Sequence, residues 1–222
     1  MKNILVFIAD KLYKPLVKYY VSHPTHYRYG GTPIIVLPGV FHPRFFFSTK
    51  LLLKLLKKEN LQNKNFLELG AGSGLISVMA AKSGAVVTAT DISSLAIENV
   101  IQNQLLNRLQ FKVIQSDLFD KIPACTFDVI VINPPYYKKN PVSEPEHAWY
   151  CGENGEYFVK LFSSLGNFMH PSTNTLMVLS DVCDIAQIKA IALQNRFELV
   201  LLSTHQLILE KNYIFRIRIL AL

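Results

Sequence analysis

The 222-residue sequence has little charge and no long apolar run. Only 18% of its residues are charged, against about 25% in an average soluble domain, while 50% are hydrophobic, so a disordered chain is excluded. Asp10, Pro15, Pro38 and Lys54 interrupt the most apolar regions, and no stretch approaches the roughly 18 residues of a membrane span. Residues 1–9 are too short for the apolar part of a secretion signal and lack a small-residue cleavage site.

Cysteine and histidine are too sparse for a disulfide framework or a metal site. The three cysteines, Cys125, Cys151 and Cys183, are odd in number, and none belongs to a CxxC pair. None of the six histidines has the spacing of a metal-ligand set. We therefore expect free thiols, a cytoplasmic location and no structural metal.

The net charge of +7 is concentrated near the N-terminus. Residues 1–60 contain ten basic and two acidic residues, a balance of +8, whereas residues 61–222 contain 13 and 14, a balance of −1. A basic surface attracts polyanions such as RNA or DNA and, more weakly, anionic lipid. The same charge could serve only to keep an apolar segment soluble, because charge alone selects no partner.

From residue 65 onward, short β-rich runs alternate with longer helical patterns, which predicts a parallel sheet with crossover helices. Seven strands are expected, at residues 66–69, 86–90, 111–115, 127–132, 176–180, 197–202 and 213–220. Helices are expected at residues 74–82, 94–106, 157–170 and 184–194, with Ser94 and Asp184 as N-caps. The last connection is too short for a helix, so the final two strands should pair antiparallel at one edge.

Residues 1–50 follow a different pattern. Leu12, Leu16, Tyr19 and Tyr20 could line one helix. Prolines and glycines then break any longer element, namely Pro24, Gly30, Gly31, Pro33, Pro38, Gly39 and Pro43. We therefore expect a basic N-terminal extension, residues 1–50, folded on a core domain of residues 51–222.

The first expected strand runs straight into a glycine-rich loop, Gly70, Ala71, Gly72, Ser73 and Gly74. Such a loop lets the backbone approach a ligand closely and adopt positive φ where needed, although alone it is often only a tight turn. A dinucleotide site would have glycine at the sixth position, where Leu75 stands. A nicotinamide oxidoreductase is therefore the weakest candidate.

The run from Glu68 to Gly74, ELGAGSG, resembles the first motif of class I S-adenosylmethionine (SAM) methyltransferases. The resemblance implies SAM as cofactor and a seven-stranded, Rossmann-like α/β sheet, mostly parallel with an antiparallel edge strand and with helices on both faces. The cofactor-binding residues that it implies are Glu68, Gly70, Ala71, Gly72, Gly74, Asp91, Ile92, Asp117, Leu118 and Asn133.

Two acids follow the next two expected strands. Asp91 lies 21 residues after Gly70, where an acid in this topology accepts hydrogen bonds from ribose hydroxyls. Asp117 occupies the place of the acid that, in SAM enzymes, binds the adenine amine. Each alone is more often a helix cap or a solvated turn residue. Ligands of open α/β sheets gather at the carboxyl ends of the strands, so one molecule could contact all three turns.

Asn133, Pro134, Pro135 and Tyr136 follow the fourth expected strand. The two prolines fix φ near about −65° and remove two backbone donors, which leaves an acceptor-rich site. A planar NH₂ group can donate to the Asn133 side-chain oxygen and to the Pro134 carbonyl, while Tyr136 stacks on it. In isolation, Asn-Pro-Pro more often only turns the chain. Here the four residues resemble the catalytic motif of amino-group methyltransferases, which methylate adenine N6, cytosine N4 or a protein glutamine amide.

Two further segments resemble the release-factor glutamine methyltransferase family. Residues 144–155 resemble its EPxxALxGGxDGL segment and depart from it at Trp149, Cys151 and Asn154. Residues 40–49 resemble its VLIPRPET segment and depart from it at Phe45, Phe46, Phe47 and Ser48. The long helical domain with which that family grips its protein substrate is replaced here by the basic extension. The three aromatics could line a substrate mouth, although such a run is more often core.

These observations favour SAM-dependent methyl transfer to a planar NH₂ nitrogen. The first candidate for the methyl acceptor is a protein glutamine, in a protein substrate related to translation, as the release-factor resemblance implies. The second is adenine N6 in RNA or DNA, which the basic N-terminal quarter favours. A third hypothesis is a SAM-binding partner protein without turnover, against which the intact motif from Asn133 to Tyr136 argues.

Overall fold

The computed structural model describes residues 22–45, 47–206 and 210–220. Its elements are β1 (Thr25–Tyr29), β2 (Thr32–Val36), α3 (Phe47–Leu56), β3 (Asn65–Leu69), α4 (Leu75–Lys82), β4 (Val86–Asp91), α5 (Ser94–Leu106), β5 (Lys112–Gln115), β6 (Phe127–Ile132), η2 (Glu144–Ala148), α6 (Glu156–Leu165), η3 (Gly166–Phe168), β7 (Met169–Ser180), α7 (Ile185–Gln194), β8 (Phe197–Gln206) and β9 (Lys211–Ile219). The helix expected around Leu12, Leu16, Tyr19 and Tyr20 lies outside the described residues.

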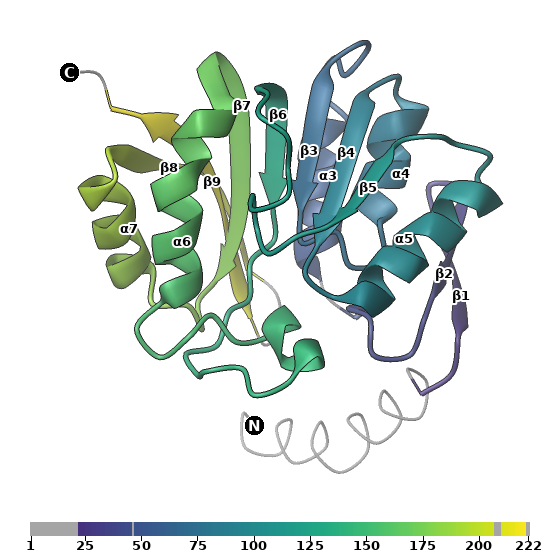
Figure 1. The fold of residues 1–222 in the computed structure, drawn as a ribbon, viewed down its shortest axis with the longest axis horizontal. Helices are drawn as coiled ribbons and strands as arrows, with labels where there is room; N and C mark the ends of the chain where they lie inside the picture. The colour runs from purple at the N-terminus through teal and green to yellow at the C-terminus, as the bar shows by residue number, and fades with distance from the viewer. Residues whose placement is uncertain (1–21, 46, 207–209, 221–222) are drawn as a thin grey trace.

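Seven strands form one sheet in the order β5-β4-β3-β6-β7-β9-β8 (Figure 1). The first five pair parallel to one another, and β9 runs antiparallel to both β7 and β8. The predicted class, a mostly parallel α/β sheet with an antiparallel pair at one edge, is confirmed. Among the described helices, none is both long and apolar enough to cross a membrane.

Helices cover both faces of this sheet, and the strand residues alternate between them. Ile130 and Ile132 pack in the hydrophobic cluster that contains α6 and α7, whereas Val129 and Val131 pack in the cluster that contains α3 and α4. Burial on both faces explains why these strands are continuous apolar runs. The core therefore lies in two layers, one on each side of β3, β6 and β7.

Most expected elements are present, with shifted ends. The expected helix 157–170 ends at Leu165, and β7 begins at Met169, because the polar start of β7 still pairs with β6 and Thr173 donates to the Phe127 carbonyl at 2.7 Å. Asp184 caps α7 as predicted. Ser94 as N-cap of α5 was wrong by one residue, since the Ser93 side chain accepts from the Ala96 amide.

The β1–β2 hairpin and α3 are elements that the sequence pattern does not predict. Gly30 and Gly31, interpreted above only as breakers, have φ values of 55° and 82° and form the two-residue turn of the hairpin. The helix α3 packs against α4 and the sheet through Leu52, Leu53 and Leu56. The division into an extension of residues 1–50 and a core of 51–222 stays a prediction.

A ladder of asparagine side chains on α5 holds the hairpin in place. The Asn103 side chain accepts from the Ile35 amide at 2.7 Å and donates to the carbonyls of Ile35 and Ser73 at 2.7 and 2.8 Å. Asn99 bonds the backbone of Leu37 and Ile35, and Asn107 donates to the Pro33 carbonyl. The side-chain amides thus form hydrogen bonds with the backbone amides and carbonyls at the free edge of β2, where a further strand would otherwise pair.

Asn103→Ala should lower the free energy of unfolding by about 2–4 kcal/mol, because it removes the partner of the half-buried Ile35 amide and of the buried Ser73 carbonyl. Urea unfolding measures this loss. Gln102→Ala on the same helix is the matched control, since within the described part of the chain the Gln102 side chain bonds only Glu98, and it should cost less than about 0.5 kcal/mol. Equal effects of the two substitutions would contradict the ladder.

Candidate functional site

A cavity of 350 Å³ lies where the carboxyl ends of β3, β4 and β6 meet. Its volume falls within the range of small-molecule sites, about 300–1,000 Å³. Twelve of the predicted site residues line it, namely Glu68, Gly70, Ala71, Gly72, Asp91, Ile92, Asp117, Leu118, Asn133, Pro134, Pro135 and Tyr136. Their individual roles stay predictions. Gly74 is not among the lining residues. A Cβ there would meet Val100 of α5 at 3.1 Å, so Gly74 allows α4 to begin close to α5.

The glycine loop is bonded to the end of β4. The amides of Gly70 and Ala71 both donate to the Thr90 carbonyl at 2.9 Å. Gly70 and Gly72 have φ values of 72° and 52°, which an L side chain rarely adopts. A Cβ at Gly72 would meet only Phe41, at 3.7 Å, so the left-handed backbone rather than lack of space requires glycine there. The loop therefore presents bare backbone to the cavity.

Asp91 joins this loop to the start of α5. Its Oδ2 accepts from the Gly72 amide at 2.9 Å, and its Oδ1 accepts from the Ser93 amide at 2.9 Å. Burial raises the pKa of the Asp91 carboxyl, although these amide bonds oppose the shift. A carboxylate has about four lone-pair positions, so Asp91 can still accept bonds from hydroxyl groups of a ligand in the cavity.

Asp117 carries an ion pair that the sequence does not reveal. Lys160 of α6 donates to Asp117 at 2.6 Å and to Asp120 at 2.7 Å. The Asp117 side chain is about half exposed. Within the described ranges Lys160 bonds Oδ2 of Asp117, so the other carboxylate oxygen of this cavity-lining residue can accept a further hydrogen bond. Lys160 itself lines the cavity. The two residues are 43 positions apart, so only the packing of α6 brings them together.

Glu68 is buried, and its carboxyl binds the first turn of α4. Its Oε2 accepts from the Ser77 amide at 2.8 Å and from the Ser77 hydroxyl. Burial raises the pKa of Glu68 to about 8, so the neutral form is present at pH 7. Glu68 therefore connects the end of β3 to α4 beneath the glycine loop.

The motif from Asn133 to Tyr136 forms one wall of the cavity. The Tyr136 hydroxyl donates to Asn133 Oδ1 at 2.9 Å, which fixes the direction of the Asn133 amide. Burial raises the pKa of the Tyr136 phenol, so the hydroxyl remains a donor. The amide oxygen has a second lone pair, and it can accept another hydrogen bond while Tyr136 is bound.

The two segments with a release-factor-like sequence meet at this cavity. Glu144 of η2 accepts from the amide and the hydroxyl of Ser94 at the start of α5. The rings of Phe41 and Trp149 lie 5.6 Å apart. The loop between β6 and α6 thus folds across the carboxyl edge of the sheet, as Figure 1 shows.

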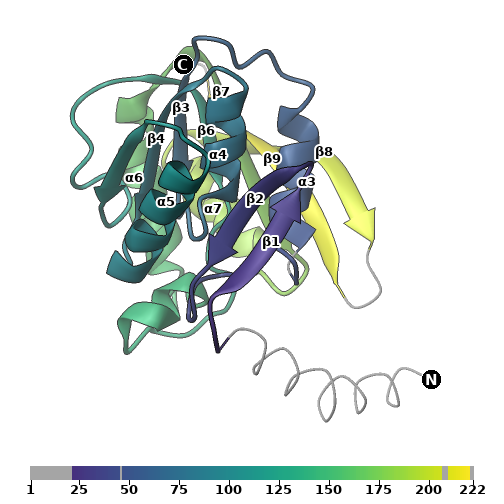
Figure 2. The ribbon, with the colours of Figure 1, turned by 90° about the vertical axis from the view of Figure 1, so that its right-hand side faces the viewer.

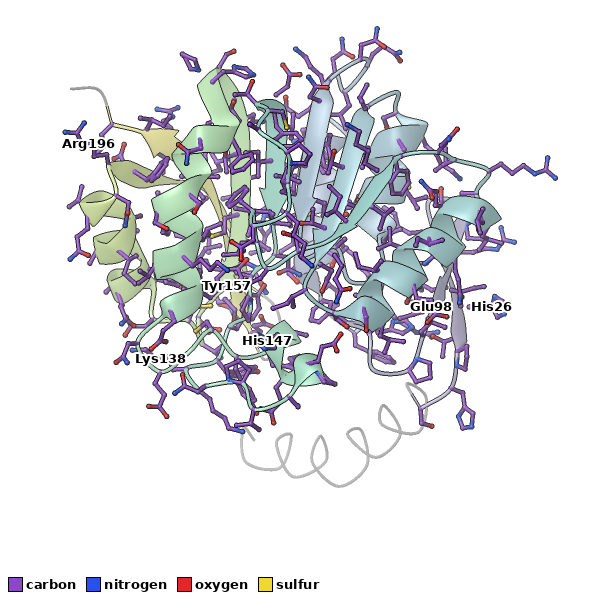
Figure 3. All side chains as sticks on the ribbon, in the orientation of Figure 1. His26, Glu98, Lys138, His147, Tyr157 and Arg196 are labelled. Atoms are coloured by element: carbon purple, nitrogen blue, oxygen red, sulfur yellow. The ribbon has the colours of Figure 1, made fainter. Side chains whose placement is uncertain are left out.

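Sequence reasoning missed Tyr157, at the start of α6 (Figure 3). It lines the cavity, and burial together with the nearby carboxyls of Asp91 and Asp117 raises the pKa of its phenol. A ring beside both acids can contact the flat face of a base. No local pattern marks this tyrosine, because its neighbours come from other strands.

Neither Phe45 nor Phe47 of the aromatic run lines the cavity. Phe45 is half-buried with its ring 5.1 Å from His42, and Phe47 is 46% exposed. The interpretation of this run as core was therefore wrong for Phe47. Phe46 lies outside the described residues.

Comparison with known proteins shows that the chain has methyltransferase relatives. A family model described as methyltransferase small domain matches residues 31–148, which is 118 of the 222 residues. The release factor glutamine methyltransferase of Fusobacterium nucleatum is 31% identical over 180 residues, covering 74% of this chain and 49% of that protein. The ribosomal RNA small subunit methyltransferase C of Haemophilus influenzae is 37% identical over 145 residues, covering 61% and 42%.

A solved T. thermophilus 16S rRNA methyltransferase, in complex with AdoMet and guanosine, shares the fold with a TM-score of 0.60. It is 19% identical and covers 87% of this chain and 50% of that one. The chain spans about half the length of the curated relatives it matches.

The buried Glu68 should make stability fall as the pH rises. Its pKa is about 8 in the folded chain and near 4.5 when unfolded, so its contribution is complete below pH 4.5 and is lost as the pH rises through 8. Burial lowers the pKa of His42 from 6.5 to about 4. Its effect on stability is therefore opposite, a rise with pH, and is complete at pH 6.5.

Urea unfolding between pH 6.5 and 8 therefore avoids the titration of His42, and the comparison with Glu68→Gln separates Glu68 from Asp91, whose pKa burial also raises. The free energy of unfolding should fall over this range in the natural chain and should change less in Glu68→Gln, which keeps an oxygen for Ser77. Parallel curves for the two proteins would contradict the neutral, buried carboxyl.

Proposed function

Because the chain belongs to the methyltransferase small domain family, we propose that it transfers a methyl group from SAM to a planar NH₂ nitrogen, with a protein glutamine amide as the first acceptor. One observation carries this proposal. The acceptor-rich motif from Asn133 to Tyr136 opens into the same cavity as the glycine loop and Asp91. A donor and an acceptor bound there would lie side by side.

The residues around the cavity fit SAM. Asp91 would hold the ribose hydroxyls, the Asp117 carboxylate would accept from the adenine amine, and the bare backbone of Gly70 and Gly72 would lie against the remaining part of the molecule. Tyr157 would contact the adenine face. When bound, SAM supplies an electrophilic methyl group on a sulfonium sulfur.

The acceptor nitrogen is held by fixed oxygens. Asn133 Oδ1 and the Pro134 carbonyl would each accept one hydrogen of the NH₂ group, and the Tyr136 hydroxyl keeps the Asn133 amide in that orientation. These bonds direct the nitrogen electron pair out of the plane of the group. Alignment of two reactants in this way can supply about 7–11 kcal/mol of the barrier. The role of the chain is therefore mainly positioning.

A glutamine acceptor is supported by the name of the F. nucleatum relative and by the two release-factor-like segments that meet at Phe41 and Trp149. A base amine of RNA is the second candidate, supported by the H. influenzae relative. Translation-related acceptors and the three free thiols both favour a cytoplasmic protein.

Incubation of the full chain with methyl-labelled SAM and a cell lysate distinguishes these acceptors. We expect protease to release the label, while RNase and DNase leave it in place. Release by RNase would instead establish the second candidate. Absence of any label in the lysate while SAM binds would support a partner protein without turnover.

Asn133→Ala should lower labelling at least about 100-fold, because the acceptor loses one of its two fixed oxygens. SAM affinity, measured by calorimetry, should change far less. Unchanged turnover would refute the role of the motif.

Asp91→Ala should weaken SAM binding at least about tenfold, since it removes the partner of the Gly72 amide and the acceptor for the ribose. Calorimetry measures this change directly. Glu98→Ala removes an exposed carboxylate from α5, outside the cavity lining, and should leave the affinity unaltered. Equal affinities of the two variants would overturn the placement of the ribose.

A further inference from the structure

One side of the described chain is rich in positive charge, and its nearest acidic neighbour in the sequence is Glu59, directly after Lys58. Residues 22–58 contain six basic residues and no Asp or Glu. Five of them form the basic stripe, which we define as Arg28, Lys50, Lys54, Lys57 and Lys58. The four lysines follow α3 and the turn after it, where the Lys57 and Lys58 amides continue helical bonds to Leu53 and Leu55. At 1.5 Å per residue, Lys50 to Lys58 spans about 12 Å.

The helix α3 separates its apolar and charged residues. Leu52, Leu53 and Leu56 are buried against the sheet and α4, whereas Lys54, Lys57 and Lys58 are exposed. The lysine side chains therefore contribute little to the core and remain accessible to a partner.

The stripe continues onto the β1–β2 hairpin. The Lys57 ammonium lies 5.0 Å from the centre of the Tyr29 ring, and Arg28 donates to the Gly31 carbonyl at 3.4 Å. Figure 2 shows the hairpin and α3 side by side on this side of the molecule. Two segments with positive charge thus form one continuous surface.

No ion pair within the described ranges neutralises these five side chains. At the start of α3, burial and the charge of Arg44 lower the pKa of Lys50, and Arg44 and Lys50 both help to lower that of His42. Lysines beside the cavity differ, because Lys138 and Lys139 pair with Asp184 and Glu146 at 2.8 and 3.6 Å. Other exposed lysines of the described ranges, such as Lys112, Lys121 and Lys189, also have no ion pair, so the stripe is distinguished by the clustering of its five basic side chains.

We propose that the basic stripe binds the phosphate backbone of RNA. Lysines spaced along one helix can neutralise successive phosphates, and such contacts require no base sequence. A membrane is the less suitable partner, because a helix that lies on lipid exposes an apolar face, whereas the leucines of α3 point inward and only Phe47 is a large exposed apolar residue on it.

One end of the stripe adjoins, in the sequence, a residue of the cavity lining. Thr49, in the first turn of α3, lines the cavity, and Lys50 follows it directly. RNA bound along the stripe would therefore extend from Lys50, next to the cavity lining in the sequence, to the hairpin. This inference goes beyond the proposed methyl transfer, because RNA binding by the stripe is compatible with a base amine as acceptor and with a protein acceptor within a ribonucleoprotein.

Fluorescence anisotropy with a labelled 20-nucleotide single-stranded RNA and the full chain tests the proposal. The triple variant Lys54→Gln, Lys57→Gln and Lys58→Gln should bind at least about tenfold more weakly than the natural chain at low salt. The slope of log affinity against log salt should become about 2 units shallower, since three phosphate contacts on a single strand contribute about 0.7 each. The corresponding triple arginine variant should restore binding.

The matched control removes three exposed lysines elsewhere, Lys112→Gln, Lys121→Gln and Lys189→Gln. Equal losses in the two glutamine triples would overturn the proposal, because net charge alone would then explain binding. If the Lys54, Lys57 and Lys58 glutamine triple lost binding to phosphatidylserine vesicles but kept its RNA binding, the proposal would also be overturned and the stripe would be assigned to lipid. SAM calorimetry on the same proteins separates the two hypotheses: RNA binding through the stripe without SAM binding would leave this inference standing while the proposed methyl transfer fails.

Discussion

The parallel register of β4, β3 and β6 is the constraint on which the candidate site depends. Glu68 of β3 lies opposite Ala89 of β4 and Val131 of β6, so the three strands end at the same level. The turns after them then meet at one edge, and the bond from the Gly72 amide to Asp91 connects two of these turns. A parallel sheet covered by helices on both faces makes this alignment rigid, because each strand is bonded on both sides. The cavity is a consequence of that alignment.

The same edge is also connected to the N-terminal hairpin. Asn103 bonds both Ile35 of β2 and the carbonyl of Ser73 in the glycine loop, so one buried side chain links the hairpin, α5 and the loop. Glu144 and Ser94 form a second link, between α5 and the segment after β6. The link through the buried Asn103 fixes one arrangement, because every alternative leaves a donor or an acceptor unpaired, whereas the link between Glu144 and Ser94 is exposed. The loops at the cavity are thus held by bonds from distant parts of the chain.

Charge is divided between two sides of the described structure. Around the cavity, lysines are paired with acids, as Lys160 is with Asp117 and Asp120. The basic side chains of α3 and the hairpin have no ion pair within the described ranges, and burial together with the charge of Arg44 lowers the pKa of Lys50. Paired charges orient individual side chains, whereas an unpaired stripe attracts a polyanion over a distance. The two regions therefore suit different tasks within one domain.

Much of the fold and of the candidate site could be predicted from sequence alone. The alternation of apolar runs and helical patterns indicated all seven strands, since strand and helix periods are local properties. The glycine loop, Asp91 and the Asn133 motif were identifiable because each directly follows a strand, and the carboxyl ends of parallel strands meet. Other features depended on contacts between residues far apart in the chain. The pairing of Lys160 with Asp117, the place of Tyr157 beside two acids and the docking of the hairpin by Asn103 were decided by tertiary structure, because the packing of α5 and α6 on the sheet creates these neighbours and no local pattern encodes them.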